Sequence, residues 1–432
     1  MLRVLDLRGR PDLTTADLRR PDVAAPDVRD AVRGILEQVR TRGDEALVEL
    51  TARFDGVRLA ADALVVDAER LDTALDGLDR ELRAALERAA EQIRWFHELA
   101  RPQDWTVEED GRRVGQRFRP LRRVGVYVPG GLAAYPSTVL MTVVPARVAG
   151  VDEVVVCTPP TGEEGWPDTA VLAAARLVGA DRVVRVGGAQ AIGAMAYGTA
   201  SVPACDKIVG PGNVYVAAAK QLVVADGRCG IDTVAGPTEV AIVADSGADP
   251  RLLAADLVAQ AEHDELATCI LVTPDEELVG PVEAALADEV AATVHRERVG
   301  TALRNQGLVV LVDDLDAAVA VVDRLAPEHL EIQTAAAAEV AERVRFAGAI
   351  FVGPTSPVSL GDYAAGPNHT LPTAGTARFA GGLTTSDFLV SVNLVEYGRE
   401  RLGELAPVVR SIAAAEDLPA HARAVDIRLE GS

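Results

Sequence analysis

Residues 123–131 read RVGVYVPGG, a short β-branched run that is closed by a proline and two glycines. Seven further runs of this kind follow in two sets, with alanine-rich helical stretches between them: EVVVCTPP (153–160), RVVRVGGAQAIG (182–193) and KIVGPGN (207–213), then EVAIVADSG (239–247), CILVTP (269–274), GLVVLVDD (307–314) and AIFVGP (349–354). Buried parallel strands are continuous apolar runs, and strands that alternate with helices form doubly wound sheets. We therefore predict an α/β fold with two Rossmann-like parallel-sheet units.

The segments outside these runs have a different pattern. Residues 23–100 place apolar side chains at three- and four-residue steps, which predicts helices throughout. The C-terminal tail reads as helices with a short final strand and is too small for a core of its own. We expect four parts: an N-terminal tail (1–22), an α/β domain made of 23–106 together with 239–381, a Rossmann-like domain (107–238) and a C-terminal tail (382–432).

Composition limits the class of protein. The chain has 432 residues, of which 49% are hydrophobic and 25% charged, and its sequence has no apolar run long enough to span a bilayer. The start, MLRVLDLRGRPDL, lacks the apolar region of a secretory signal, so we expect a cytoplasmic protein. The formal net charge of −22 would repel phosphate backbones and anionic lipid, which argues against nucleic acid and membranes as partners.

Cysteine and lysine offer little chemistry. The four cysteines are far apart and lie in or beside apolar stretches, so we expect buried thiols rather than a zinc knuckle or a redox pair: Cys157, Cys205, Cys229 and Cys269. Lysine occurs only at Lys207 and Lys220, against 41 arginines. Lysine-based covalent or base chemistry therefore has few candidates.

Glycine-rich turns are the first candidate ligand sites, because ligands of open α/β sheets collect at the carboxyl ends of the strands. Glycine lets the backbone approach a ligand closely, and a following helix N-terminus favours an anion such as pyrophosphate. None of the turns has GxGxxG spacing, and a purely structural turn is the alternative for each one. They are VPGG (128–131), GGAQAIG (187–193), GPGN (210–213) and GPTE (236–239), and their clustering predicts a nucleotide site in the first unit.

Several histidines of the second unit and the tail stand beside carboxylates, amides or turn residues. In AQAEHDE (259–265), Gln260 lies three residues before His263, so both share one face if the segment is helical. A solvated helix end and a pair that binds one ion or ligand are both open interpretations. Further pairs are Glu328 with His329 in LAPEHLEI, Asp362 with His369 in GDYAAGPNHTLPT, and Glu416 with His421 in AAAEDLPAHARA.

These residue types suit metal binding and proton transfer. Imidazole and carboxylate are ordinary zinc ligands and an amide oxygen is a weaker one, although spacing alone does not select a set from Gln260, His263, Asp362 and His421. Glu328 and His329 are adjacent and face different directions, so they suit two proton-transfer groups better than one bidentate ligand. A surface Glu-His pair is the alternative. We expect His97 to be packed in a helix, beside Trp95 and Phe96.

Taken together, these segments resemble the histidinol dehydrogenase family over about residues 23–430. The matching stretches are VGVYVPGG, STVLMTVVPARVAGV, VGGAQAIGAMAYGT, DKIVGPGN, AQAEHD, APEHLEI, GDYAAGPNHTLPT and AAAEDLPAHARAV. The resemblance implies a zinc-dependent homodimer that oxidises L-histidinol to L-histidine through L-histidinal with two NAD+, the last step of histidine biosynthesis. It also implies that the tail is exchanged, so that each active site is shared between subunits.

The resemblance further implies roles for individual residues. Glu328 and His329 would be the acid/base residues. One Zn²⁺ per subunit, held mainly by the domain made of 23–106 and 239–381, would be bound by Gln260, His263, Asp362 and His421. NAD, in the domain 107–238, would contact Tyr127, Gln190 and Asn213. The substrate would contact Thr238, His329, His369 and Glu416, together with Gln260, His263, Asp362 and His421 around the zinc.

Two positions depart from the family pattern. Thr238 stands where many members have serine; threonine retains the hydroxyl and adds a methyl group. Val358 stands where an acidic residue is frequent.

Two other functions stay open: a paralogous zinc and NAD alcohol dehydrogenase that acts on another small polar alcohol such as a sulfonated diol, and a non-catalytic metal or nucleotide binding protein. The intact Glu328 and His329 pair favours an enzyme.

Overall fold

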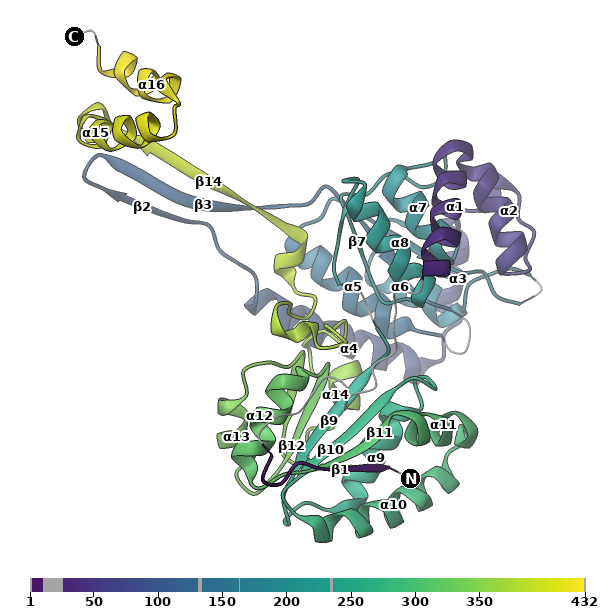
Figure 1. Cartoon of the computed structure of the whole chain (residues 1–432). Helices are drawn as coiled ribbons and strands as arrows, with labels where there is room; N and C mark the ends of the chain where they lie inside the picture. Colours follow the sequence, from purple (N-terminus) through teal and green to yellow (C-terminus); the bar gives the residue numbers. More distant parts are fainter. Residues whose placement is uncertain (1, 11–25, 131–133, 163, 234–235, 431–432) are drawn as a thin grey trace.

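A computed structural model describes residues 2–10, 26–130, 134–162, 164–233 and 236–430 of the chain. Its strands form a five-stranded and a six-stranded parallel sheet, and a three-stranded antiparallel sheet that projects from the body as an arm (Figure 1). The predicted α/β fold with two parallel-sheet units is therefore confirmed. None of the described helices is long and apolar enough to cross a membrane.

The first parallel sheet has Rossmann topology. Its strands are β4 (Arg123–Tyr127), β5 (Glu153–Thr158), β6 (Arg182–Arg185), β7 (Lys207–Val209) and β8 (Gly230–Ile231), in the spatial order β6-β5-β4-β7-β8. Helices cover both faces: α5 (Pro136–Ala149) and α6 (Thr169–Leu177) pack on one, α7 (Gly188–Tyr197) and α8 (Val214–Ala225) on the other. Because both faces are covered, the strands are continuous apolar runs.

The N-terminal helices complete this first unit. They are α1 (Pro26–Arg42), α2 (Asp44–Phe54), α3 (Ala68–Asp76) and α4 (Arg80–Leu99), as the three- and four-residue apolar spacing predicts. Their buried side chains join the core of the first sheet: Val32 of α1 packs in the same cluster as Ile192 of α7, and Ile93 of α4 in the same cluster as Val139 of α5. The predicted grouping of 23–106 with 239–381 is wrong for these helices, because an amphipathic pattern shows which face is buried but not which partner covers it.

The second parallel sheet repeats the same topology. Its strands are β9 (Glu239–Ala244), β10 (Thr268–Thr273), β11 (Gly307–Leu311), β12 (His329–Gln333) and β13 (Ala349–Val352), in the order β11-β10-β9-β12-β13. The N-terminal strand β1 (Arg3–Asp6) is added beside β11, so the predicted tail 1–22 contains part of the sheet, and residues 11–22 lie outside the described ones. Helices α9 (Pro250–Ala261), α10 (Val279–Ala292) and α11 (Arg296–Gln306) pack on one face and α12 (Leu315–Leu325) and α13 (Ala337–Arg343) on the other; α14 (Val358–Tyr363) follows β13.

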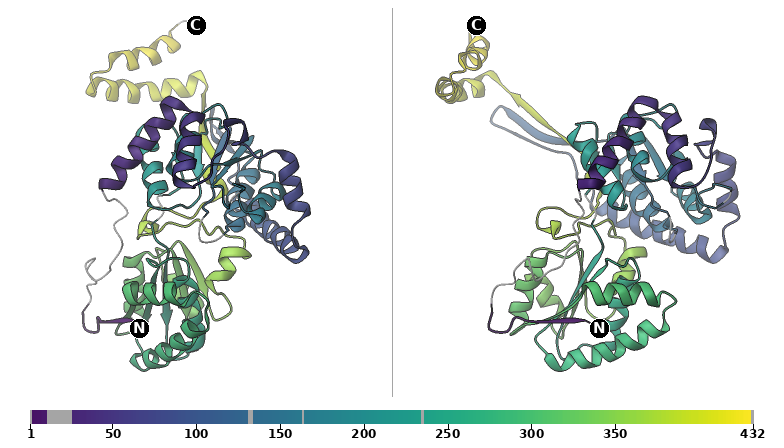
Figure 2. Two further views of the ribbon diagram at one scale, coloured as in Figure 1. Left: turned by 90° about the vertical axis from the view of Figure 1, so that its right-hand side faces the viewer. Right: turned by 45° about the vertical axis from the view of Figure 1, so that its right-hand side comes forward.

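The arm consists of β2 (Trp105–Glu109), β3 (Arg112–Pro120) and β14 (Leu389–Tyr397), in the order β14-β3-β2. At its tip, α15 (Arg399–Ala415) and α16 (Pro419–Leu429) pack on each other, away from both parallel sheets (Figures 1 and 2). The tail therefore has a strand before its helices, whereas the sequence pattern predicted a short strand after them. Short 3-10 turns are η2 (Ala61–Ala63), η3 (Glu276–Leu278), η4 (Thr376–Arg378) and η5 (Thr385–Phe388).

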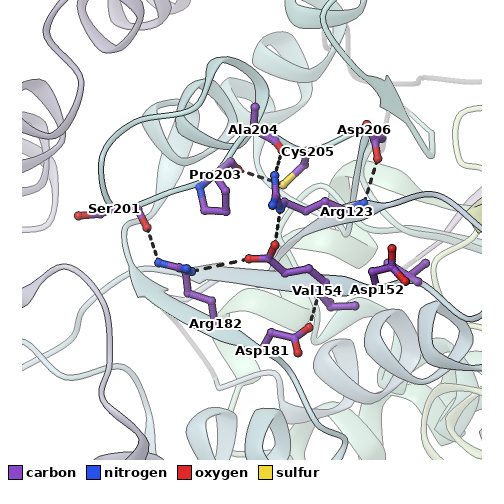
Figure 3. Close-up of polar contacts among 12 residues, drawn as sticks. Arg123, Asp152, Val154, Asp181, Arg182, Ser201, Pro203, Ala204, Cys205 and Asp206 are labelled. Carbon is purple, nitrogen blue, oxygen red and sulfur yellow. Dashed lines mark hydrogen bonds and ion pairs between the residues drawn. The ribbon is translucent and has the colours of Figure 1, made fainter.

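The amino ends of the first-sheet strands are closed by polar contacts (Figure 3). The Arg123 guanidinium donates to Glu153 (Nε to Oε2, 2.6 Å) and to the carbonyl of Ala204 (Nη1 to O, 2.9 Å). The backbone N–H of Arg123 donates to Asp206 Oδ2 (2.9 Å), and the N–H of Val154 to Asp181 Oδ2 (2.6 Å). The carboxyl ends, which carry the glycine turns, are consequently the edge at which this sheet can receive a ligand.

Candidate functional site

The carboxyl edge of the first sheet and the amino edge of the second are joined by one short linker. Strand β8 ends at Ile231 and β9 begins at Glu239, a stretch of chain that reaches at most about 30 Å when fully extended. Gly236 in this linker donates its N–H to Thr373 Oγ1 (2.6 Å), which ties the linker to the second unit. The GPTE turn consequently precedes a strand, whereas ligands of open α/β sheets usually bind at turns that follow the strands. Three candidate side chains of the second unit, Thr238, Glu328 and His329, lie at the amino ends of β9 and β12.

Glu328 and His329 lie at the start of β12 and are almost completely buried. His329 Nδ1 lies 3.1 Å from the backbone carbonyl of Glu239, and a carbonyl can only accept, so Nδ1 carries the proton. His329 Nε2 is then the ring nitrogen with the free lone pair, and it is buried without a hydrogen-bond partner. Burial also lowers the pKa of His329, which keeps the ring neutral and able to accept a proton at Nε2.

Glu328 has an unusual carboxyl group. Burial raises its pKa to about 8, and the negative charge of Asp362 acts in the same direction. The hydroxyl of Thr238 (2.6 Å) and the N–H of Glu239 (2.9 Å) donate to Glu328 Oε2 and partly oppose this shift. Such a carboxyl group can gain or lose a proton near neutral pH, as an acid/base residue requires.

Thr238 connects this carboxyl group to Gln260. The amide Nε2 of Gln260 donates to Thr238 Oγ1 (2.6 Å), while the same hydroxyl donates to Glu328. The orientation of the amide is thereby fixed, with Oε1 left buried and without a partner. A buried amide oxygen with no hydrogen bond is a suitable ligand for a metal cation.

Asp362 lies between the histidines. Its carboxylate oxygens are 3.9 Å from His263 Nε2 and 3.9 Å from His329 Nε2, and its backbone carbonyl is 3.0 Å from His369 Nδ1. Burial raises the pKa of Asp362, which the two histidines oppose, and lowers that of His369 to about 4. The pattern is that of a buried carboxylate with too little positive charge nearby, which a divalent cation would supply.

A cavity of about 460 Å³ is lined by three of the candidate residues. His329, Asp362 and His369 supply its polar wall, and strand β13 and the segment after it supply apolar walls such as Phe351 and Leu371. This volume is within the range of small-molecule sites.

The structure does not bring the tail residues to this site. Glu416 and His421 are exposed; Glu416 is the C-cap of α15 and His421 lies in α16, at the arm tip and away from the second parallel sheet (Figure 1). Within the described residues, no three His, Cys, Asp or Glu side chains come together as metal ligands. One of the predicted zinc ligands is a glutamine and another is His421, so a single chain presents at most part of the predicted set.

The three predicted NAD contacts lie at the carboxyl edge of the first sheet. Tyr127 ends β4, and its hydroxyl accepts the N–H of Gly188 (3.1 Å) at the start of α7, the helix that also carries Gln190. Asn213 caps α8: its Oδ1 accepts from Tyr215 N–H (3.0 Å) and Val216 N–H (3.2 Å), so its NH2 is the group left for a ligand. The strands β4 and β7 flank the point where strand order reverses, where dinucleotides bind in Rossmann sheets.

Sequence reasoning missed a carboxyl pair behind the site. Glu331 of β12 accepts the N–H of Val358 at Oε1 (3.0 Å), and its carboxyl group lies near that of Asp256 of α9. Burial and Asp256 raise the pKa of Glu331 to about 8. A carboxyl group is therefore present next to Val358 although residue 358 itself is apolar, and this pair links the elements that carry Gln260, His329 and Asp362. The Glu and the Gln at alternate positions of HLEIQ were the available sequence indication of this pair.

Comparisons with known proteins agree with one another. The model of the histidinol dehydrogenase family matches residues 18–429. A histidinol dehydrogenase from Thermobifida fusca is 51% identical over 428 residues, which cover 98% of this chain and 97% of the relative. The chain belongs to the histidinol dehydrogenase family. A family member from Mycobacterium bovis is also 51% identical, over 100% of this chain and 98% of its own length. The crystal structure of histidinol dehydrogenase from Elizabethkingia anophelis superposes with a TM-score of 0.94 at 33% identity, and covers 99% of this chain and 98% of that one.

Proposed function

We propose that this chain is an NAD-dependent oxidoreductase that converts L-histidinol to L-histidine through L-histidinal, using two NAD+ and one Zn²⁺ per subunit, as the last step of histidine biosynthesis. The observation that carries the proposal is the geometry of His329, whose Nδ1 is hydrogen-bonded to a carbonyl and whose Nε2 is buried and unpartnered beside Asp362. A neutral imidazole held in this tautomer is suited to accept the proton of an alcohol.

The segment 239–381 would hold the metal and the acid/base residues. Gln260, His263 and Asp362 would bind the zinc, with His421 of the partner subunit as a further ligand, and the unpartnered amide oxygen of Gln260 supports this. Bound zinc supplies a Lewis-acidic template for the imidazole and amino nitrogens of the substrate. Thr238, His369 and Glu416 of the partner subunit would complete the substrate pocket.

The segment 107–238 would bind NAD, with Tyr127, Gln190 and Asn213 in contact with it. NAD+ accepts the hydride in each of the two oxidation steps. In the first step His329 Nε2 takes the hydroxyl proton while the carbinol carbon loses hydride, which gives the aldehyde. In the second step Glu328 takes a proton from water as the water oxygen adds to the aldehyde, and the resulting hydrate loses hydride and a proton to give the carboxylate.

The two copies of a dimer would exchange their arms. The tip helices leave large apolar side chains exposed at Val408, Ile412, Leu418 and Ile427, and the arm strand β14 leaves Val395 72% exposed. Such an area on an arm with no core of its own suits contact with a second copy. Each site would then combine the body of one subunit with the tail of the other.

Turnover with defined alcohols tests the function. We expect L-histidinol to yield two NADH per molecule, and we expect chelation of zinc to abolish this activity and added Zn²⁺ to restore it. A panel of other small polar alcohols, including sulfonated diols, should give little NADH. An enzyme saturated with zinc that does not oxidise L-histidinol would contradict the proposal, and one NADH per histidinol would contradict the second step.

A further inference from the structure

The chain's second lysine forms a buried ion pair beside the proposed NAD edge. The side chains of Lys220, on α8, and Asp232, just after β8, are each 3% exposed and contact each other directly. Lys220 Nζ also donates to the carbonyl of Gly210 (2.7 Å), and Asp232 Oδ2 accepts the N–H of Gly210 (2.7 Å). One ion pair therefore holds both backbone polar groups of a single residue.

Gly210 is the residue at which β7 becomes the GPGN turn. Its φ of +110° suits only glycine, and a Cβ there would lie 2.1 Å from the carbonyl oxygen of Tyr127. The backbone of this turn is thus pressed against the end of β4, three residues before Asn213. A small shift of Gly210 would move Asn213 relative to Tyr127.

The same ion pair also holds the start of the linker to the second sheet. Lys220 Nζ lies 3.5 Å from the carbonyl of Thr233, the residue that follows Asp232. The linker runs on to Thr238, whose hydroxyl contacts Glu328 and Gln260. The ion pair therefore contacts both the GPGN turn and the start of the linker that leads to Thr238.

Stability alone does not account for this ion pair. Taking two charges out of water costs so much that apolar residues of similar volume often stabilise a protein equally well or better. The arrangement instead has the features of a positioning device, in which fixed charges orient backbone groups.

We propose that Lys220 and Asp232 are positioning residues that hold the Gly210–Asn213 turn and the start of the linker at Thr233 in one frame, so that bound NAD is aligned with the substrate site. This inference rests on the proposed function, because it requires that the GPGN edge binds NAD. The two residues would not touch the reacting atoms.

The test is the double substitution Lys220→Met with Asp232→Leu in the full-length protein. It removes the anchor of Gly210 without leaving an unpaired buried charge, so folding is expected to survive. We expect the Kd for NADH, measured by its fluorescence, and the KM for NAD+ to rise about tenfold or more. Zinc content and the KM for L-histidinol should stay within about twofold of wild type, a split that general destabilisation does not produce.

Two further variants make the result decisive. Lys207→Met changes the only other lysine, whose Nζ donates to Asp387 Oδ1 (2.9 Å) near the base of the arm, and should leave the Kd for NADH unchanged. If the double variant does not fold, Lys220→Met with Asp232→Asn, which also leaves no buried charge and keeps the side-chain volume at position 232, is read by the same criteria.

The inference and the proposed function fail differently. A folded variant with wild-type affinity for NADH, or with NAD+ and L-histidinol KM values raised in parallel, would overturn the inference alone. Wild-type protein that does not bind NADH would overturn the proposed function, and the inference with it.

Discussion

The two parallel sheets share one strand order but present their chemistry at opposite ends. In the first sheet the central pair β4 and β7 places Tyr127 and Asn213 at its carboxyl edge. In the second sheet the equivalent pair β9 and β12 places Thr238, Glu328 and His329 at its amino edge. These two edges are consecutive along the chain, because the linker from β8 to β9 leaves the carboxyl edge of one sheet and enters the amino edge of the other.

The two edges also differ in what they leave unsatisfied. At the first edge the groups that define the surface are already bonded: Asn213 caps a helix, and Gly210 is held by an ion pair. At the second edge Gln260 Oε1 and His329 Nε2 are buried without partners, and burial shifts the pKa values of several carboxyl groups and histidines. A preformed backbone surface suits a cofactor that brings its own chemistry, whereas unsatisfied ionisable groups suit a metal ion and proton transfer.

The largest expected effect is at His329. The substitution His329→Gln keeps a donor for the Glu239 carbonyl but removes the basic nitrogen, so kcat should fall by about 10² to 10⁴. Zinc content, measured by metal analysis, and NADH affinity should be retained. The exposed His295 provides the matched control, since His295→Gln should be fully active. A His329→Gln enzyme with near-normal kcat would remove this residue from the mechanism.

The next effect distinguishes a metal ligand from its charged neighbour. Gln260→Ala should weaken zinc binding by about tenfold or more, because it removes the buried amide oxygen. Glu262→Ala should leave zinc affinity unchanged, since that side chain is exposed at the end of α9. Competition with a chelator gives both affinities, and equal values would contradict the assignment of Gln260.

At the first edge, Asn213→Ala should affect the cofactor but not the metal. The KM for NAD+ should rise several-fold while zinc affinity is unchanged, and the lost helix cap should cost about 1 kcal/mol of stability. Asp79 caps α4 with the same geometry, accepting from Glu81 and Leu82, so Asp79→Ala should cost similar stability and leave the KM for NAD+ unchanged. Identical kinetics of the two variants would show that the cap has no cofactor role.

The smallest effect concerns a buried histidine away from both edges. His97 Nε2 is also unpartnered, and burial lowers its pKa from 6.5 to about 4, a shift that the negative charge of Asp387 only partly opposes. The folded form resists protonation, so stability is complete above pH 6.5 and is lost as pH falls from 6.5 towards 4, by at most about 1.4 kcal/mol per pH unit. His97→Gln should reduce this slope in urea unfolding and leave kcat unchanged at neutral pH. An unaltered slope would mean that other groups dominate acid unfolding.

Much of the fold was predictable because buried parallel strands are recognisable as apolar runs. Strand β12 was missed because its run, HLEIQ, contains Glu, Gln and His, which interrupt the apolar pattern of a buried strand. The hairpin of β2 and β3 was missed because β2 is exposed along its whole length and lacks an apolar face. Its turn, Asp110 and Gly111, has φ of +49° and +70°, and this Asp-Gly pair was the available sequence indication.

The candidate site was predictable only in part. Asp362, His263, Gln260, Glu328 and His329 converge in the fold, although the segments that carry them are spread over about a hundred residues of sequence. Residue types suggested their chemistry, and the family resemblance selected them, but no spacing rule could bring these segments together. The Lys220 and Asp232 pair was invisible for the same reason: only the fold shows that one pair holds both backbone groups of Gly210.

The central claim is that each site combines the body of one subunit with the tail of the other. Its most direct test mixes His421→Ala and His329→Ala chains, each inactive alone, under conditions where subunit exchange is confirmed by mass. Random mixing makes half of the dimers hybrid, and each hybrid has one intact site, so about a quarter of wild-type activity should return. No activity in a sample with confirmed hybrids would show that His421 acts within its own chain.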